Sequence, residues 1–225
     1  KYSDYGVEGG GPVVKDKLFV WGAYGKTNPQ MEVYSYNPAE RTVGVQGEDN
    51  CSGFGTYTAP AESYVLTARD CTTLENYAAK ATAVFSDKLR ASFTYFRGDK
   101  IKLGRNAASN RPAPTTWNQK GPTDLFKGEA NYTMSNTTFL TVRYAYAGGG
   151  FSFEPVGGRD TQRYQDDAGI FQNTYSWYET DRPQSNLQLE GNYFKGKHEL
   201  KFGFGWRKSS VTSQSGFPGG LYTTH

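Results

Sequence analysis

Apolar and polar residues alternate one by one along many segments of this chain, and this period of two restricts the possible folds more than any other feature. In residues 187–193 the odd positions carry Leu, Gly and Tyr while the even positions carry Gln, Glu and Asn, and residues 200–207 alternate as regularly. Successive side chains of a β-strand point to opposite faces, so each segment predicts a strand with one apolar and one polar face. Six further segments have this character: 5–14, 18–24, 77–85, 89–95, 126–134 and 140–146.

One of these segments allows a second interpretation. Residues 77–84 place Ala79, Ala81 and Ala83 on one strand face, but the same run of Ala residues also suits a short helix. The sequence therefore predicts an all-β chain of about eight strands, with a short helix at 77–84 as the alternative.

The chain is poor in the large aliphatic residues of an ordinary core. Leu, Ile, Val and Phe together make up only about 17% of it, a content typical of disorder when the net charge is large. Here the formal net charge is +3, and 17 Tyr, 14 Phe and 4 Trp also argue against disorder. A soluble all-β binding protein, which would bury all its apolar faces in one core, is disfavoured for lack of aliphatic residues.

Short and long connections alternate along the chain. Three long loops are rare in a compact soluble domain, whereas outer-membrane β-barrels join antiparallel strands by short periplasmic turns and long extracellular loops, with an apolar face toward lipid and a polar lumen. Residues 1–225 are therefore predicted to be a partial outer-membrane β-barrel domain, an antiparallel transmembrane section in contact with the lipid of the bacterial outer membrane. The predicted hairpins lie near 5–24, 77–97, 124–146 and 185–208, and the long loops at 25–76, 98–123 and 147–184.

The first hairpin carries the most specific motif. Residues 9–20 are Gly-Gly-Gly-Pro-Val-Val-Lys-Asp-Lys-Leu-Phe-Val, and this run resembles an early barrel hairpin of the TonB-dependent receptors of the Oar-like type. The resemblance implies active import of a ligand such as a peptide, a glycan or an iron chelate. It also implies an inner-membrane energy-transducing complex as partner, engaged through a segment that is not identified in this sequence. The alternative is a passive porin-like or adhesin-type barrel whose long loops bind a partner.

Residues for catalysis or cofactor binding are sparse. His198 and His225 are the two histidines available to a catalytic triad, and Gly148–Gly150 open no recognisable helix of the kind that a phosphate-binding loop precedes. We therefore predict no enzyme activity, no catalytic residue and no cofactor. The near-balanced charge gives no reason to expect nucleic-acid binding.

Acidic residues between positions 160 and 181 allow a calcium site, but they lack the regular oxygen-ligand spacing of calcium loops. No metal site is predicted there, and a solvated or internally paired loop is expected instead. Cys51 and Cys71 lie in a stretch without nearby histidines, which disfavours metal ligation. They are predicted to form a disulfide within the first long loop, with two free thiols as the alternative.

Two lumen-facing charge pairs follow from the predicted turns. A three-residue turn at 135–137 sets Glu129 opposite Arg143. In the last hairpin, a two-residue turn at positions 195 and 196 sets Glu190 opposite Lys201.

The third long loop concentrates aromatic residues, which offer rigid contact area with polar handles. This loop is the candidate ligand-contact segment, with packing of the loop onto itself as an equal alternative. The residues concerned are Tyr164, Phe171, Tyr175, Trp177 and Tyr178.

The order of the connections predicts that the barrel is incomplete. The first connection is the short turn at 15–17, so both ends of the chain are expected on the side of the long loops. Further strands are then expected at each end, and the eight strands are expected to form an open sheet in which the first and the last do not pair.

Overall fold

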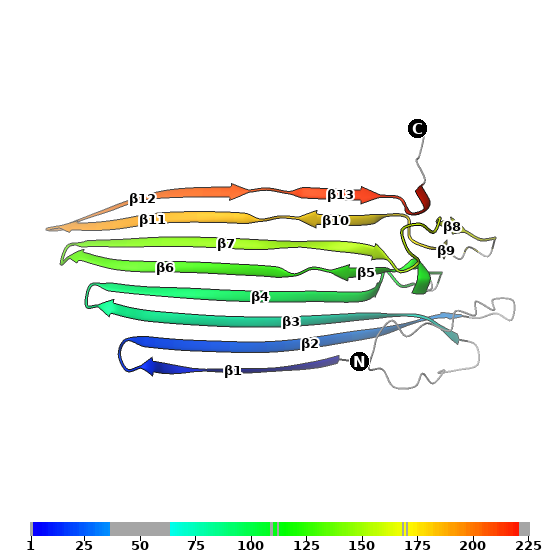
Figure 1. Ribbon diagram of the computed structural model, residues 1–225, viewed down its shortest axis with the longest axis horizontal. Helices are drawn as coiled ribbons and strands as arrows, with labels where there is room; N and C mark the ends of the chain where they lie inside the picture. The colour runs from blue at the N-terminus through cyan, green and yellow to red at the C-terminus, as the bar shows by residue number, and fades with distance from the viewer. Residues whose placement is uncertain are drawn as a thin grey trace.

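The computed structural model describes residues 2–36, 64–108, 110–111, 113–167, 169 and 171–220, and in these residues the chain is all-β. Its strands form one large antiparallel sheet of hairpins (Figure 1) and a separate pair, β8–β9. The elements are β1 (Tyr2–Val14), β2 (Leu18–Tyr36), β3 (Tyr64–Ser86), β4 (Leu89–Arg105), η1 (Ala113–Thr115), β5 (Trp117–Lys120), β6 (Thr123–Ser135), β7 (Thr138–Pro155), β8 (Tyr164–Gln165), β9 (Phe171–Gln172), β10 (Trp177–Asp181), β11 (Gln184–Lys195), β12 (His198–Ser209), β13 (Thr212–Gly216) and η2 (Pro218–Gly220).

The large sheet consists of eight rows, because three rows are each divided between two strands. β5 and β6 both lie between β4 and β7, β10 and β11 both follow β7, and β13 and β12 make the last row. The register with β7 is the same for β10 and β11, so the division does not shift the pairing. β1 and the β12–β13 row form the two edges, and in the described part of the chain they do not pair. The sheet is open, as predicted.

Tight turns close the four hairpins at one end of the sheet, which we call the turn end; the opposite end is the loop end (Figure 1). Ser86 pairs with Leu89, and Ser135 with Thr138, so the turns at 87–88 and 136–137 have two residues, each with a neighbouring β-bulge. In the first turn Asp16 has a φ of 61°. The Ala-rich segment 77–84 belongs to β3, so the helical alternative is wrong.

Several strands run further toward the loop end than predicted. β2 continues to Tyr36 and β3 begins at Tyr64, so residues 25–36 and 64–76 are paired strand and not loop. β4 and β7 likewise extend into predicted loops, as do β5 and β10. The predicted loop boundaries were wrong because polar residues or glycines begin these extensions, such as Lys26 to Asn28 in β2 and Gly148 to Gly150 in β7. Hydrophobic alternation then disappears although the backbone ladder continues.

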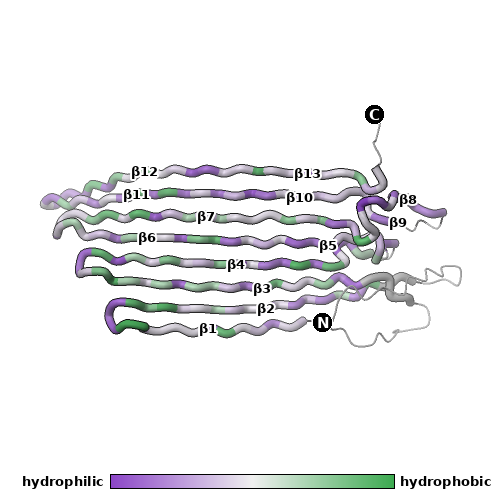
Figure 2. The backbone as a smooth tube through the Cα atoms, in the orientation of Figure 1, coloured by the Kyte–Doolittle hydropathy of each residue, from purple (hydrophilic) through white to green (hydrophobic). Residues whose placement is uncertain are grey.

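The described residues contain almost no conventional core. Their buried hydrophobic side chains are Cys71, Ala113 and Trp117, and all three lie toward the loop end. Large apolar side chains of the sheet stay exposed; Phe204, for example, keeps 57% of its surface accessible. Figure 2 shows apolar and polar residues alternating along the rows. The chain therefore holds its sheet together by edge-to-edge strand pairing, and leaves its apolar surface uncovered.

Candidate functional site

Near the turn end, every row places apolar side chains on one side of the sheet, although Phe19, Trp21, Phe139 and Phe194 lie on the other side. Leu189 of β11 is flanked by Val142 of β7 and Phe204 of β12. The alignment continues across the sheet, where Phe93 of β4 pairs with Gly128 of β6. We call this side the apolar face and the opposite side the polar face. The apolar face is continuous because every hairpin keeps the apolar residues in register.

A row of aromatic rings borders the apolar face on its loop side. Neighbouring rings lie close together, with centroid distances of 5.1 Å between Tyr24 and Tyr77 and 4.9 Å between Tyr95 and Phe126. Tyr146 of β7 continues the row, 6.4 Å from Phe126. We call these five residues the girdle row. It crosses the sheet from β2 to β7, with a step of two residues between Tyr77 of β3 and Tyr95 of β4.

Charged residues lie immediately beyond the girdle row. Lys26 Nζ is 2.6 Å from Glu75 Oε1, and Arg97 binds Asp99 and Asp124 at 2.8 and 3.5 Å. The tyrosine hydroxyls point to these charges: Tyr95 donates to Asp124 Oδ1 at 2.8 Å, and Tyr24 donates to Glu75 Oε1 at 3.4 Å.

The polar face carries a chain of ion pairs across β6, β7 and β11. Glu129 lies opposite Arg143, as predicted, and Arg143 Nε is 3.2 Å from Glu129 Oε2. Arg143 Nη1 also lies 2.7 Å from Glu190 Oε2. The predicted register of this hairpin is confirmed, although a two-residue turn with a bulge produces it in place of a three-residue turn.

The predicted pairing of Glu190 with Lys201 is wrong. Gly196 and Lys197 form the turn, so Glu190 lies opposite Gly203, while Lys201 lies opposite Asn192. Gly196 takes the first central position with a φ of 60°, a conformation that Gly adopts without strain. The turn is thus one residue later than predicted, which shifts the register by two residues. Lys201 instead lies 3.4 Å from Glu199, and all three charged residues remain on the polar face.

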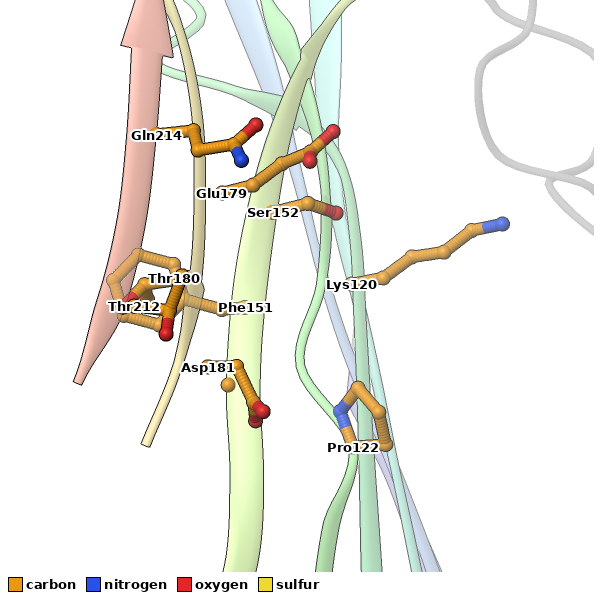
Figure 3. A pocket seen from close by; sticks show the side chains of 10 residues that line it. Lys120, Pro122, Phe151, Ser152, Glu179, Thr180, Asp181, Thr212 and Gln214 are labelled. Carbon is orange, nitrogen blue, oxygen red and sulfur yellow. The ribbon is translucent and has the colours of Figure 1, made fainter. Parts of the chain in front are cut away.

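Beyond the girdle row the two faces exchange their character. On β7, Ser152 and Glu154 now occupy the side of the apolar face, whereas Phe151 and Phe153 occupy the side of the polar face. A groove of about 490 Å³ lies beside these residues, and its lining combines polar side chains such as Lys120, Ser152 and Glu179 with Pro122, Gly150 and Phe151. Figure 3 shows the side chains of Lys120, Ser152 and Glu179 reaching toward the side of the apolar face.

On the polar-face side of the loop end, aromatic rings form a contiguous strip. Phe151 and Phe153 have centroids 5.0 Å apart, Tyr178 lies 5.4 Å from Phe151, and Trp117 lies 5.9 Å from Phe153. Tyr175 meets the edge of Trp117 at 5.3 Å. We call these five residues the aromatic strip. They line a groove of about 680 Å³ together with Lys102 and Arg105, a size suited to a small ligand.

Arginine side chains lie against the aromatic strip. The guanidinium of Arg105 is 4.8 Å from the Phe153 centroid and donates to Gln119 Oε1 at 2.8 Å. The guanidinium of Arg182 is 5.4 Å from the Phe151 centroid and donates to the hydroxyls of Tyr178 and Thr180. Among the described residues, no carboxylate lies within ion-pair distance of either guanidinium. Both are held by cation–π and neutral hydrogen-bond contacts.

The five predicted ligand-contact residues lie in four different surroundings. Tyr175 and Tyr178 belong to the aromatic strip, whereas Trp177 lies on the other side of the sheet, with Arg159 4.2 Å above its ring. Phe171 packs against Arg111 and Arg163, at 4.7 and 5.2 Å. Tyr164 is in β8 and is 59% exposed. The loop therefore packs partly onto itself and partly onto the sheet.

Sequence reasoning missed Trp117, Phe151, Phe153, Arg105 and Arg182. One signal was present, since Phe151 and Phe153 are spaced two apart like residues on one strand face. The three glycines before them suggested the beginning of a loop, although β7 continues through these glycines to Pro155.

The cysteine prediction lies partly outside the described residues. Cys71 is buried in β3, between Gln30 of β2 and Leu103 of β4, and so lies in a strand and not in a loop. Cys51 is outside the described residues, and the disulfide between Cys51 and Cys71 stays a prediction.

Two ionisable groups near the strip have shifted pKa values. Hydrogen bonding with Ser213, Thr180 and Arg182, of which the contact with Ser213 contributes most, lowers the pKa of Tyr178 to about 8. On the other side of the sheet, Arg159 binds both Glu154 and Glu179 and lowers the pKa of Glu154. The two arginines differ in their partners: carboxylates neutralise the charge of Arg159, whereas Arg182 binds the uncharged hydroxyls of Tyr178 and Thr180.

Among the described residues, no group of three or more His, Cys, Asp or Glu side chains is placed to hold a metal ion. The described part of the chain also contains no helix long and apolar enough to cross a membrane. Comparison with models of protein families, with curated proteins and with solved structures gives no match. Arguments about function therefore rest on the residues and their geometry.

Proposed function

We propose that this chain is a section of the wall of an outer-membrane β-barrel, belonging to a TonB-dependent receptor that takes up a ligand such as a peptide, a glycan or an iron chelate. The observation that carries the proposal is the continuous, exposed apolar face that ends at the girdle row. Barrels that cross the outer membrane present such an apolar band to lipid and border it with aromatic residues. In this arrangement the polar face lines the lumen and the loop end is extracellular.

The charges beyond the girdle row support this orientation. A tyrosine at a membrane interface keeps its ring in the apolar layer and its hydroxyl in the polar layer. Tyr24, Tyr77 and Tyr95 all donate their hydroxyls to carboxylates on the loop side. The apolar layer would therefore lie between the turns and the girdle row.

The choice of an energised receptor over a passive barrel rests on the first hairpin. The motif of residues 9–20 occupies β1, the turn at 15–17 and the start of β2, which is the position in a hairpin that the resemblance implies. The alternative is a passive porin-like or adhesin-type barrel, which would have the same apolar face as an energised receptor. Energised uptake predicts that ligand accumulation stops when a protonophore collapses the inner-membrane gradient, whereas passive entry continues.

Two tryptophans offer a direct test of the lipid-facing side. Trp206 is on the apolar face and Trp21 on the polar face, and their exposures are similar, at 44% and 38%. Variants that retain only one of the two tryptophans, with Phe at the other Trp positions, are reconstituted into vesicles of lipids with brominated acyl chains. We expect the bromines to quench Trp206 strongly and Trp21 weakly, and aqueous iodide to do the reverse.

The matched pair makes the result unambiguous. Equal quenching of both tryptophans by iodide, with none by brominated lipid, would contradict the membrane assignment. Far-UV circular dichroism of each variant checks that the strand content is unchanged.

A further inference from the structure

Eight of the described arginines fall into two groups, to which Arg90 and Arg207 do not belong. Arg69, Arg97, Arg143 and Arg159 each lie within ion-pair distance of at least one carboxylate. By contrast, four arginines of the loop end lie against aromatic rings, and no carboxylate of the described residues is within ion-pair distance of any of them. These are Arg105, Arg111, Arg163 and Arg182.

The second group accumulates positive charge along one aromatic path. Arg111 and Arg163 both lie against Phe171, and Arg163 is also 6.0 Å from the Tyr175 ring. From Tyr175 the path continues through the aromatic strip to Arg105 and Arg182. Like charges brought together without counter-charges repel each other, and a cation–π contact offsets only part of this cost. A bound anion would remove it.

Two guanidiniums near the groove, those of Arg105 and Arg182, have no carboxylate of the described residues within ion-pair distance, whereas Lys102 has one. Lys102 is neutralised by Asp70, whose Oδ2 lies 2.9 Å from Lys102 Nζ. Arg105 retains its full charge at the groove wall, and Arg182 adds a second charge beside Phe151. A guanidinium offers several N–H donors in a planar fork that matches a carboxylate. The Phe151, Phe153 and Tyr178 rings provide apolar contact area between these donors.

We propose that the aromatic strip and its arginines bind a small polycarboxylate ligand that carries a planar ring. The ring contacts Phe151, Phe153 and Tyr178, and the carboxylates bind Arg105 and Arg182. This names the class of ligand for the receptor proposed above and so rests on that function. We expect the ligand to carry at least two carboxylates, because a single carboxylate would leave Arg105 or Arg182 without a partner.

Three probes of similar size separate the contributions of charge and ring. Benzene-1,3,5-tricarboxylate has both, benzene-1,3,5-tricarboxamide has the ring without charge, and propane-1,2,3-tricarboxylate has the charge without the ring. Binding to the purified protein in detergent is measured by isothermal titration calorimetry at low ionic strength. We expect the benzene tricarboxylate to bind about tenfold or more tightly than the amide, and about fivefold more tightly than the acyclic anion.

Arginine variants locate the site. Arg105→Gln and Arg182→Gln are each expected to weaken binding of the benzene tricarboxylate about five- to tenfold. Arg207→Gln is the matched control, because Arg207 also lies on the polar-face side, hydrogen-bonded to Gln184 at 2.7 Å, but belongs to β12 away from the groove. It should bind like the unaltered protein. Circular dichroism of each variant confirms that it is folded.

Two results would overturn this proposal. Equal affinity for the benzene tricarboxylate and the benzene tricarboxamide would show that the arginines do not contribute to binding through the charge of the ligand. Equal losses in Arg105→Gln, Arg182→Gln and Arg207→Gln would show a diffuse charge effect without a site. Neither result touches the lipid-quenching test of Trp206 and Trp21, so failure of this binding site and failure of the barrel assignment are distinguishable.

Discussion

The half of the sheet next to the turns and the half next to the loops share the same rows, and along β7 the same register, yet on β7 their large apolar side chains lie on opposite sides of the sheet. In the turn half, Val142 lies on the apolar face and Arg143 on the polar face; in the loop half, Ser152 and Phe153 reverse this assignment. Strand pairing depends on the backbone and continues through the reversal. The side chains alone therefore decide what each half contacts.

The reversal also separates two uses of aromatic residues. In the girdle row, rings lie on the apolar face and their hydroxyls bind charges at its border. In the aromatic strip, rings lie on the opposite side and hold arginines. If the turn half is in lipid, as proposed, the first set anchors the sheet and the second is left to bind a ligand from the aqueous side.

The largest effect is expected from a charge placed on the apolar face of the turn half. Val142→Arg puts a guanidinium at the centre of this face, where Val142 is 43% exposed. An Arg on the lipid side near the bilayer midplane destabilises a barrel by about 2–4 kcal/mol. We therefore expect the free energy of unfolding, measured by guanidinium titration in lipid vesicles, to fall by about this amount.

The matched control is Ala145→Arg, three residues along β7 on the polar face, opposite Lys127 and Asn186. This change should cost less than about 1 kcal/mol, because a lumen-facing charge stays hydrated. Similar losses in both variants would contradict the assignment of the faces.

A smaller effect is expected where β7 passes into the loop half. A Cβ at Gly150 would overlap the carbonyl oxygen of Thr180, a backbone atom of β10 that cannot turn aside. Overpacking of this kind costs about 1–3 kcal/mol, so Gly150→Ala should destabilise the protein by that amount and loosen the β7–β10 pairing. Gly128→Ala, whose Cβ would meet nothing within 4 Å, should leave the stability nearly unchanged. Native-state hydrogen exchange distinguishes the two variants, because the β10 amides should exchange faster in Gly150→Ala and at an unchanged rate in Gly128→Ala.

The turn half could be predicted from the sequence because one signal, the period of two, specifies both its strands and its faces. The register of β6 with β7, and with it the pairing of Glu129 with Arg143, was predicted from a three-residue turn at 135–137, and the two-residue turn with its bulge gives the same register. The register of the last hairpin was predicted wrongly, since Lys195–Gly196 and Gly196–Lys197 both suit a two-residue turn and both keep the apolar residues together. In the structure Gly196 has a φ of 60° and is the first of the two turn residues, which identifies Gly196–Lys197 as the turn.

The loop half was predicted poorly for a physical reason. Its strands are stabilised by backbone pairing and by polar contacts such as that of Lys102 with Asp70, neither of which leaves a hydrophobic period. The aromatic strip combines Trp117 of β5 with rings of β7 and β10, which lie far apart in the sequence. A single sequence contains no signal that brings these segments together. Of the five predicted loop aromatics, Tyr175 and Tyr178 belong to the aromatic strip, and Tyr164, Phe171 and Trp177 lie outside it.

A third prediction compares charge pairs within the turn half. Arg143→Gln removes the pairs with both Glu129 and Glu190, and we expect the free energy of unfolding to fall by about 1 kcal/mol. Lys201→Gln, at a side chain that is 72% exposed, should have almost no effect. A loss above about 3 kcal/mol for Arg143→Gln would indicate that the polar face is dry, because only buried ion pairs cost so much to break.

The smallest effect concerns the titration of Tyr178 in the loop half. Hydrogen bonding with Ser213, Thr180 and Arg182 favours the phenolate and lowers its pKa to about 8, from an ordinary value of 10. Between pH 8 and 10 the unfolded chain therefore binds more protons at this residue than the folded chain, so the contribution to stability rises with pH and is lost as pH falls through 8. Tyr178 is solvent-accessible, so its stability effect will be slight and the titration itself is the measurement. The difference in absorbance at 295 nm between the protein and Tyr178→Phe should titrate near pH 8. Ser213→Ala and Arg182→Gln should each move that midpoint upward, whereas Arg207→Gln should leave it in place. A midpoint near 10 in the unaltered protein would show that the hydroxyl does not contact these donors in solution, and would remove one wall of the aromatic strip.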